Sequence, residues 1–289
     1  MTNDTRQALP LIFPDWPAPP WVKAVTTTRQ GGFSRSPYDH FNLGQYVGEN
    51  ADTVQLNQQL LESLLSVGNI QWIKQVHGVD VVNIGNTAQT ADAASAIDID
   101  KTGGVSSFKQ VDMLIADGCY TQNRNTACAL VTADCLPILI TDKRGTKVAA
   151  LHAGWRGLAA GIIGRGFRAA NINPAEALVW LGPAIGASVY EVGDEVRQAF
   201  INASADPHFC VGSDAKRYSD SIIASNFIST RKDHYLCNMV GLARSELEHM
   251  GVLGVYGGDH CTYSDPEQFY SFRRDGNTGR FASLIWIGD

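Results

Sequence analysis

The chain has 289 residues, of which 44% are hydrophobic and 18% are charged, and it carries a formal net charge of −6. This composition is typical of a folded globular protein and excludes intrinsic disorder, collagen-like repeats and a coiled coil. The surplus of acidic residues argues against a nucleic-acid partner, and no apolar run approaches the roughly 18 residues that span a membrane.

The N-terminal sequence MTNDTRQALP has neither the basic start nor the apolar core of a secretory signal. We therefore expect a cytoplasmic protein. No shift in composition divides the chain, so we expect a single domain over 1–289 with an extended, proline-rich arm over 1–20. In that compartment the six cysteines are expected to be thiols, and they are Cys119, Cys128, Cys135, Cys210, Cys237 and Cys261.

The first predicted helix follows this arm. Asp52 is expected to cap a helix over 53–65, where leucine and valine recur at helical spacing. Segment 87–107 is rich in Ala, Asp, Thr and Gly and has weak periodicity, so it predicts an inserted surface loop without a catalytic role.

The middle of the chain alternates short apolar runs with longer amphipathic segments. It predicts strands over 127–131, 136–141, 147–151 and 177–181, and helices over 155–170, 194–202 and 235–250. The tail predicts a β-hairpin of 268–273 with 280–287, in which Arg273, Arg274 and Asp275 form a structural ion-pair corner. Mixed strands and helices with a terminal hairpin indicate an α/β (α+β) fold with mixed sheets.

Three polar residues stand where apolar strands end. His77 follows the run 71–73, Cys135 lies between two apolar runs, and His152 closes a strand just before a glycine turn. Because α/β enzymes place reactive groups at strand ends followed by turns, these three are the candidate site.

Two imidazoles and one thiolate form a ligand set that zinc accepts, and three protein ligands leave a fourth position open for water. Such a metal lowers the pKa of its water to about 7. The three residues are far apart in the sequence and form no short CxxC or HxxxH pair. Spacing alone therefore leaves an alternative open, in which Cys135 is a packed thiol and the histidines are hydrogen-bonded strand ends.

Other charged residues are candidates for binding an anion. Arg29 precedes a glycine turn with exposed N–H groups, which suits an oxyanion, although it also fits a solvated loop arginine. Arg156 stands at the start of a predicted helix and suits a phosphate or carboxylate. The run Asp259-His260-Cys261 follows a predicted strand end, where it is either a pocket wall or an acid/base pair.

Eight motifs in order resemble the YfiH/laccase-domain family, which is also labelled multicopper polyphenol oxidase and purine nucleoside phosphorylase. The resemblance covers about 13–287. The motifs are TTTRQGGFS from Thr26, NLG from Asn42, QVHG from Gln75, TADCLP from Thr132, LHAGWRG from Leu151, LGPAIG from Leu181, GGDHCTY from Gly257 and FRRD from Phe272.

The resemblance implies a single-domain layered sandwich of mixed β-sheets flanked by helices. It implies metal ligands at His77, Cys135 and His152, with zinc as the cofactor and copper as an adventitious replacement. The candidates for binding substrate or phosphate are Arg29, Asn42, Arg156, Asp259 and His260. Two features depart from the family: the 87–107 segment is longer than expected, and His260 stands where close relatives are expected to carry arginine.

The resemblance implies a zinc-dependent purine nucleoside phosphorylase acting on adenosine, inosine and methylthioadenosine, with adenosine deamination as a side activity. Asp117 and Asp134 are the carboxylates nearest the metal in sequence, and neither can be assigned a role. One alternative is an amidase that edits a peptidoglycan precursor, UDP-muramoyl-serine. A copper polyphenol oxidase is less favoured, because the seven histidines include no His-x-His pair. We expect a small-molecule substrate and a monomer or homodimer.

Overall fold

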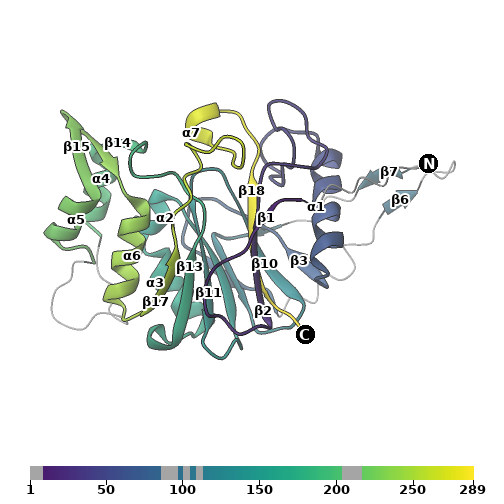
Figure 1. Cartoon of the computed structure of the whole chain (residues 1–289), viewed down its shortest axis with the longest axis horizontal. Helices are drawn as coiled ribbons and strands as arrows, with labels where there is room; N and C mark the ends of the chain where they lie inside the picture. Colours follow the sequence, from purple (N-terminus) through teal and green to yellow (C-terminus); the bar gives the residue numbers. More distant parts are fainter. Residues whose placement is uncertain (1–8, 86–96, 100–104, 109–112, 204–216) are drawn as a thin grey trace.

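The computed structural model describes residues 9–85, 97–99, 105–108, 113–203 and 217–289. Two mixed sheets lie face to face at the centre of the molecule, and helices cover the outer side of each (Figure 1). The layered α/β architecture with mixed sheets expected from the sequence is therefore confirmed. None of the described helices is long and apolar enough to cross a membrane.

The first sheet has five strands and is antiparallel except at one edge, where β10 pairs with β3 in parallel. Its strands in spatial order are β1 (Leu11–Ile12), β2 (Val22–Thr27), β18 (Phe281–Ile287), β10 (Thr126–Thr132) and β3 (Asn69–Gln71).

The second sheet has six strands, with an antiparallel centre and a parallel pair at each edge. Its strands in spatial order are β17 (Gly254–Gly257), β13 (Ala177–Leu181), β11 (Leu136–Asp142), β12 (Val148–Ala153), β9 (Gly118–Thr121) and β5 (Val81–Asn83).

Alternation along the central strands builds the core on both faces of each sheet. On β10, Cys128 and Leu130 point into the layer between the sheets, whereas Ala127 and Ala129 face the opposite side, toward α1 (Ala51–Leu65). This is the two-residue period of a strand that is buried on both faces. Long apolar runs in the sequence are therefore central strands and not amphipathic surface strands.

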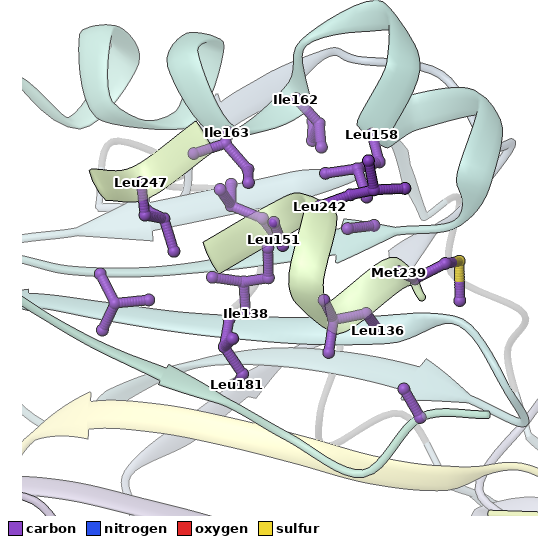
Figure 2. Packing of buried hydrophobic residues seen from close by; sticks show 14 of the residues in the cluster. Leu136, Ile138, Leu151, Leu158, Ile162, Ile163, Leu181, Met239, Leu242 and Leu247 are labelled. Atoms are coloured by element: carbon purple, nitrogen blue, oxygen red, sulfur yellow. The ribbon is translucent and has the colours of Figure 1, made fainter. Parts of the chain in front are cut away.

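Helices α2 (Trp155–Ala160), α3 (Ile162–Ala170) and α6 (Met239–His249) cover the outer face of the six-stranded sheet. Figure 2 shows Leu158, Ile163 and Leu247 from these helices above the strand residues of that sheet. A smaller region lies beyond them and contains α4 (Asp194–Ile201), α5 (Asp220–Asn226), β14 (Glu191–Gly193), β15 (Phe227–Arg231) and β16 (His234–Cys237) (Figure 1).

The remaining elements are short. They are β4 (Ile73–Lys74) paired with β8 (Leu114–Ile115), β6 (Ile97–Ile99) paired with β7 (Val105–Phe108), the 3₁₀ turn Pro174–Glu176 and α7 (Phe272–Asp275). The β6–β7 pair corrects part of the predicted 87–107 loop, because two short strands occur there. The rest of that segment, residues 1–8 of the arm and Cys210 lie outside the described residues.

Two helix predictions need correction. Asn50 caps α1, since its side chain accepts a hydrogen bond from the Thr53 amide at 3.1 Å, whereas Asp52 lies within the first turn. The helix predicted over 155–170 is two helices, α2 and α3, which meet at Gly161 with φ of 92°. Glycine adopts this left-handed conformation without the steric cost that a side chain brings.

The end of the chain also differs from the prediction. Residues 235–237 belong to β16, and Asn238 caps α6 where the helix was expected to have already begun. The terminal hairpin is wrong: Ser271 caps the short helix α7, and β18 inserts between β2 and β10. Pairing with two distant strands of the sheet buries every residue of β18, which a local hairpin would not.

Candidate metal centre

The three candidate ligands reach one place from different strands. Cys135 lies in the crossing from β10 of one sheet to β11 of the other, just after Asp134, whose φ is 95°. His152 lies on β12 opposite Pro137 of β11, so the strand register sets it near that crossing. His77 lies in a turn after β4, with φ of 61°.

The structure brings the three side chains together. One ligand atom from each lies within 4.8 Å of the others, and the Cys135 Sγ to His77 Nε2 distance is 3.7 Å. The two imidazole rings meet edge to face with centroids 4.8 Å apart. His152 is buried, Cys135 is half-buried and His77 is exposed, so the group opens to one side.

Asp117 organises this group from behind. Its Oδ1 accepts hydrogen bonds from the His77 amide and from His152 Nδ1, both at 2.8 Å, and its Oδ2 accepts one from the Gly78 amide at 2.6 Å. Although burial raises the pKa of Asp117, these hydrogen bonds and the charge of His152 hold it below its usual value. Because Nδ1 of His152 is occupied, Nε2 is the nitrogen left to bind a metal.

The electrostatics of the trio favour a thiolate. Burial raises the pKa of Cys135, but the charge of His152 and hydrogen bonds from both histidines outweigh burial and lower the pKa to about 6. Burial lowers the pKa of His152, but the Cys135 thiolate and the Asp117 carboxylate raise it to about 9. At neutral pH the sulfur is therefore negative, which is the form that binds metal ions.

The donor set fits a metal ion. A thiolate and two imidazoles are ligands that zinc and copper both accept, and three protein ligands leave a tetrahedral position open. Gly154 leaves the space beside the candidate ligands open. A Cβ at this position would lie 2.9 Å from Cδ2 of His77 and 3.1 Å from Sγ of Cys135. The chain thus avoids a side chain where the ligands converge.

The trio lines a cavity of about 470 Å³. Aromatic side chains supply much of its wall, namely Tyr46, Trp72, Trp155, Tyr190 and Phe272. This size and the mixture of aromatic and charged groups are typical of a site for a small organic molecule.

Three arginines line the same cavity. Arg156 was expected there, and its guanidinium lies over the Trp155 ring, 4.3 Å from the centroid. Arg273 and Arg280 were missed as site residues, because the predicted hairpin placed Arg273 in an ion-pair corner and Arg280 at the start of its second strand. That interpretation holds for Arg274 and Asp275, which pair at 2.8 Å, but Arg273 lies over the ring of Tyr190.

Neither carboxylate near the ligands in sequence is free to act as a base. Asp117 is fully buried and its oxygens are hydrogen-bonded as described above. Asp134 lines the cavity, but its Oδ1 accepts from Thr262 Oγ1 at 2.6 Å and its Oδ2 accepts from the Arg273 amide at 2.7 Å. Both therefore serve to position their neighbours.

Arg29 and Asn42 lie away from the cavity wall. Arg29 lines a separate cavity of about 610 Å³, and its Nε and Nη1 donate to the carbonyl oxygens of Asp39 and Pro266 at 3.0 Å. Asn42 is fully buried, and its Oδ1 accepts from the Arg280 amide at 2.8 Å. The structure therefore does not bring these two residues to the candidate ligands: Arg29 holds a loop and Asn42 holds the backbone of Arg280.

The cluster after β17 also does not line the cavity that contains the candidate ligands. The ring of His260 packs near Phe269 with centroids 5.8 Å apart, and Asp259 is exposed. Cys261 accepts a hydrogen bond from the Gly186 amide at 3.2 Å. Asp259 and His260 are therefore not brought to the candidate ligands.

Comparison with known proteins bears on this site. The model of a family described as multi-copper polyphenol oxidoreductase laccase matches residues 23–288. A protein of Escherichia coli called purine nucleoside phosphorylase YfiH is 41% identical over 281 residues, covering 96% of this chain and 98% of that protein. A purine nucleoside phosphorylase of Pseudomonas aeruginosa is 40% identical over 279 residues, with the same coverage.

Two solved structures have the same fold over nearly their whole length. A Neisseria meningitidis protein superposes with a TM-score of 0.78 at 38% identity, covering 96% of this chain and 99% of that one. YlmD from Geobacillus stearothermophilus superposes with a TM-score of 0.74 at 27% identity, covering 94% of each chain. The sandwich of two mixed sheets is thus shared across these relatives.

Proposed function

Since the chain belongs to the multi-copper polyphenol oxidoreductase laccase family, we propose that it is a zinc-dependent purine nucleoside phosphorylase. The proposed substrates are adenosine, inosine and methylthioadenosine, with adenosine deamination as a side activity. The names of the relatives in E. coli and P. aeruginosa support the phosphorylase activity. The observation that carries the proposal is the cavity in which His77, Cys135 and His152 share a wall with aromatic rings and three arginines.

Each part of this cavity matches one requirement of nucleoside phosphorolysis. A purine is flat and largely apolar, so the rings of Trp155 and Phe272 offer surfaces for stacking. Phosphate is an anion, and the guanidinium groups of the cavity are its natural partners. His77, Cys135 and His152 would hold the zinc ion, which would supply a Lewis acid beside the substrate.

The reaction balances without an external reagent. An oxygen of hydrogen phosphate forms a bond to C1′ of the ribose while the bond from C1′ to N9 of the purine breaks. The electron pair of that bond leaves with the base, and the proton of hydrogen phosphate ends on the base. Deamination of adenosine exchanges the amine at C6 for an oxygen from water and releases ammonia.

Polyphenol oxidation is not the function that we propose. Within the described part of the chain, the structure groups His77, Cys135 and His152 as the single set of at least three His, Cys, Asp or Glu that could hold a metal. A multi-copper enzyme needs several coupled centres. Copper bound in place of zinc in this one set is the expected source of any laccase activity.

The test is to incubate purified protein with inosine and phosphate and measure hypoxanthine and ribose 1-phosphate. Cys135→Ala, His77→Ala and His152→Ala are each expected to lose metal and to fall to the activity of chelator-treated protein. Cys261→Ala is the matched control, because this half-buried thiol lies outside the cavity. Full metal content in Cys135→Ala would refute the site.

The same protein is assayed with UDP-muramoyl-serine. Release of serine from it, with no ribose 1-phosphate formed from inosine above the chelated control, would replace the phosphorylase proposal with the amidase.

A further inference from the structure

Neighbouring arginines on α7 use their guanidinium groups in opposite ways. All three nitrogens of Arg274 are occupied: Nε and Nη2 donate to Asp275, Nη1 donates to the carbonyls of Thr262 and Tyr263, and Nη2 also donates to the carbonyl of Phe269. Arg273 donates from Nη1 to the Glu191 carbonyl at 2.7 Å. Within the described residues, no acceptor is found for its Nε or Nη2. Arg274 is thus structural, whereas Arg273 retains donors for a ligand.

Arg280 shares this pattern. Its Nη1 donates to the carbonyls of Thr278 and Gly279 at 2.8 and 2.9 Å, and the described residues provide no acceptor for Nε and Nη2. Burial lowers the pKa of Arg280, and the negative charges of Cys135 and Asp134 oppose that effect. A partly desolvated cation of this kind gains more from an anion than a fully hydrated one does.

Buried polar side chains fix the backbone of both arginines. Asp134 accepts the Arg273 amide at 2.7 Å, and Asn42 accepts the Arg280 amide at 2.8 Å. Each partner is itself held by further hydrogen bonds: Thr262 donates to Asp134, and Asn42 donates to Glu49. The two guanidinium groups are therefore held at the cavity wall before any ligand arrives.

The cavity has an excess of positive charge. Its lining contains Arg156, Arg273 and Arg280 against a single carboxylate, Asp134, which is occupied by Thr262 and by the Arg273 amide. Among the described carboxylates, none lies within 4 Å of these three guanidinium groups as an ion-pair partner. An unpaired set of cations beside a metal site is suited to a multiply charged anion.

We propose that Arg273 and Arg280 form the phosphate subsite of this cavity and bind a tetrahedral phosphate through their free Nε and Nη2 donors. This inference rests on the proposed function for the role of phosphate as co-substrate. The phosphate has two chemical sources, inorganic phosphate and the phosphoryl group of a nucleotide. The subsite replaces Arg29, which the sequence favoured but the structure places in another cavity.

The test measures the binding of phosphate to the metal-loaded enzyme in two ways. Direct titration with inorganic phosphate needs no turnover, and steady-state assays give separate KM values for phosphate and inosine. Arg273→Lys and Arg280→Lys keep the charge but lose the planar fork, so each should raise Kd and KM for phosphate by about tenfold or more. The KM for inosine should stay within about twofold. Arg273→Gln and Arg280→Gln should raise the Kd and KM for phosphate further, because they also remove the charge.

Arg144→Gln is the control, because this arginine is largely exposed and lies outside the cavity. Thermal unfolding of each variant separates lost binding from lost folding, and added guanidinium should restore phosphate binding to Arg273→Ala. Unchanged phosphate KM in folded Arg273 and Arg280 variants would overturn the subsite while the phosphorylase stands. The subsite would also be overturned if Arg156→Gln were the one variant that raised the Kd and KM for phosphate, because the anion would then bind at α2.

If phosphate binds and the variants lose it but inosine is not cleaved, the subsite stands and the proposed function fails. Titration with adenosine 5′-monophosphate distinguishes the sources. Wild-type binding of the nucleotide but not of inorganic phosphate, lost in both arginine variants, assigns the subsite to a phosphoryl group of the substrate.

Discussion

At the scale of single residues, Asp117 contacts the segments that carry two of the three candidate ligands, although it is not a candidate ligand itself. Its two oxygens hold the His152 ring and the amides of the turn that carries His77. One buried carboxylate therefore sets the orientation of two of the three ligands. Its position just before β9 places it in the core, where the sequence offers no pattern to mark it.

We predict that Asp117→Asn lowers metal affinity by about 10- to 100-fold, because an amide cannot accept all of these hydrogen bonds at once. Competition with a chromophoric chelator measures the affinity. Asp142→Asn is the matched control, since Asp142 is also buried and accepts the Thr146 amide at 2.6 Å, but far from the ligands. Equal loss of affinity in the two variants would contradict the specific role of Asp117.

The sequence predicted which three residues would lie together as candidate ligands, but it did not predict which arginines line the same cavity. His77, Cys135 and His152 could be recognised because each stands where an apolar strand was expected to end, and the structure brings them together. The sequence could not show whether Arg29 or Arg273 lines the cavity. A guanidinium group reaches far from its own backbone, and its partners here are carbonyls from distant segments. Arg29 uses Pro266 and Arg273 uses Glu191.

At the scale of elements, the break between α2 and α3 shows how a turn is fixed by a distant side chain. A Cβ at Gly161 would lie 2.6 Å from Nη2 of Arg217, and Arg217 is held by Nη1 hydrogen bonds to the carbonyls of Leu158 and Ala159 at 3.3 and 3.0 Å. The other side of Arg217 faces Glu246 of α6 at 3.5 Å. Arg217 therefore links the end of α2, where the break occurs, to α6.

Gly161→Ala should lower the free energy of unfolding by at least about 1–2 kcal/mol, because alanine is strained at this positive φ and its methyl group would displace Arg217. Urea unfolding followed by circular dichroism provides the measurement. Gly288→Ala serves as control, since a Cβ there meets its nearest atoms at an ordinary 3.4 Å. An unfolding midpoint for Gly161→Ala equal to that of wild type would show that neither cause applies.

Elements were predicted best where the sequence signal for them is local. The strands near 127–131, 136–141 and 177–181 carry unbroken apolar runs and were placed within a few residues. The terminal hairpin failed because β18 gains its burial by pairing with β2 and β10, which are more than a hundred residues away in sequence. The turn-forming residues in 275–279 could not reveal that β18 pairs with these distant strands.

For the whole molecule, the candidate ligands come from different parts of the fold. Cys135 lies where the chain passes between the two sheets, His152 lies on the six-stranded sheet, and His77 lies in a separate turn. A bound metal would therefore link segments that separate when the protein unfolds. Unfolding should accordingly depend on free metal concentration.

Free zinc at about 100 times its Kd should raise the free energy of unfolding by about 2.7 kcal/mol, and a chelator should remove this gain. Urea titrations in buffered zinc measure it. Cys135→Ala should show no zinc-dependent gain, whereas Cys261→Ala should respond as the wild type does. A wild-type midpoint that ignores both zinc and chelator would exclude a metal held at the trio.

The sequence by itself determined the family, the layered α/β class and the residue types of the candidate metal centre, because apolar runs and short motifs are local properties of the chain. Tertiary structure decided which polar groups share the cavity. Asn42, Asp117 and Asp134 proved to be buried supports, and Arg273 and Arg280 proved to line the cavity. The physical reason is that a side chain's role depends on which of its hydrogen-bonding atoms are already satisfied, and only the folded chain settles that.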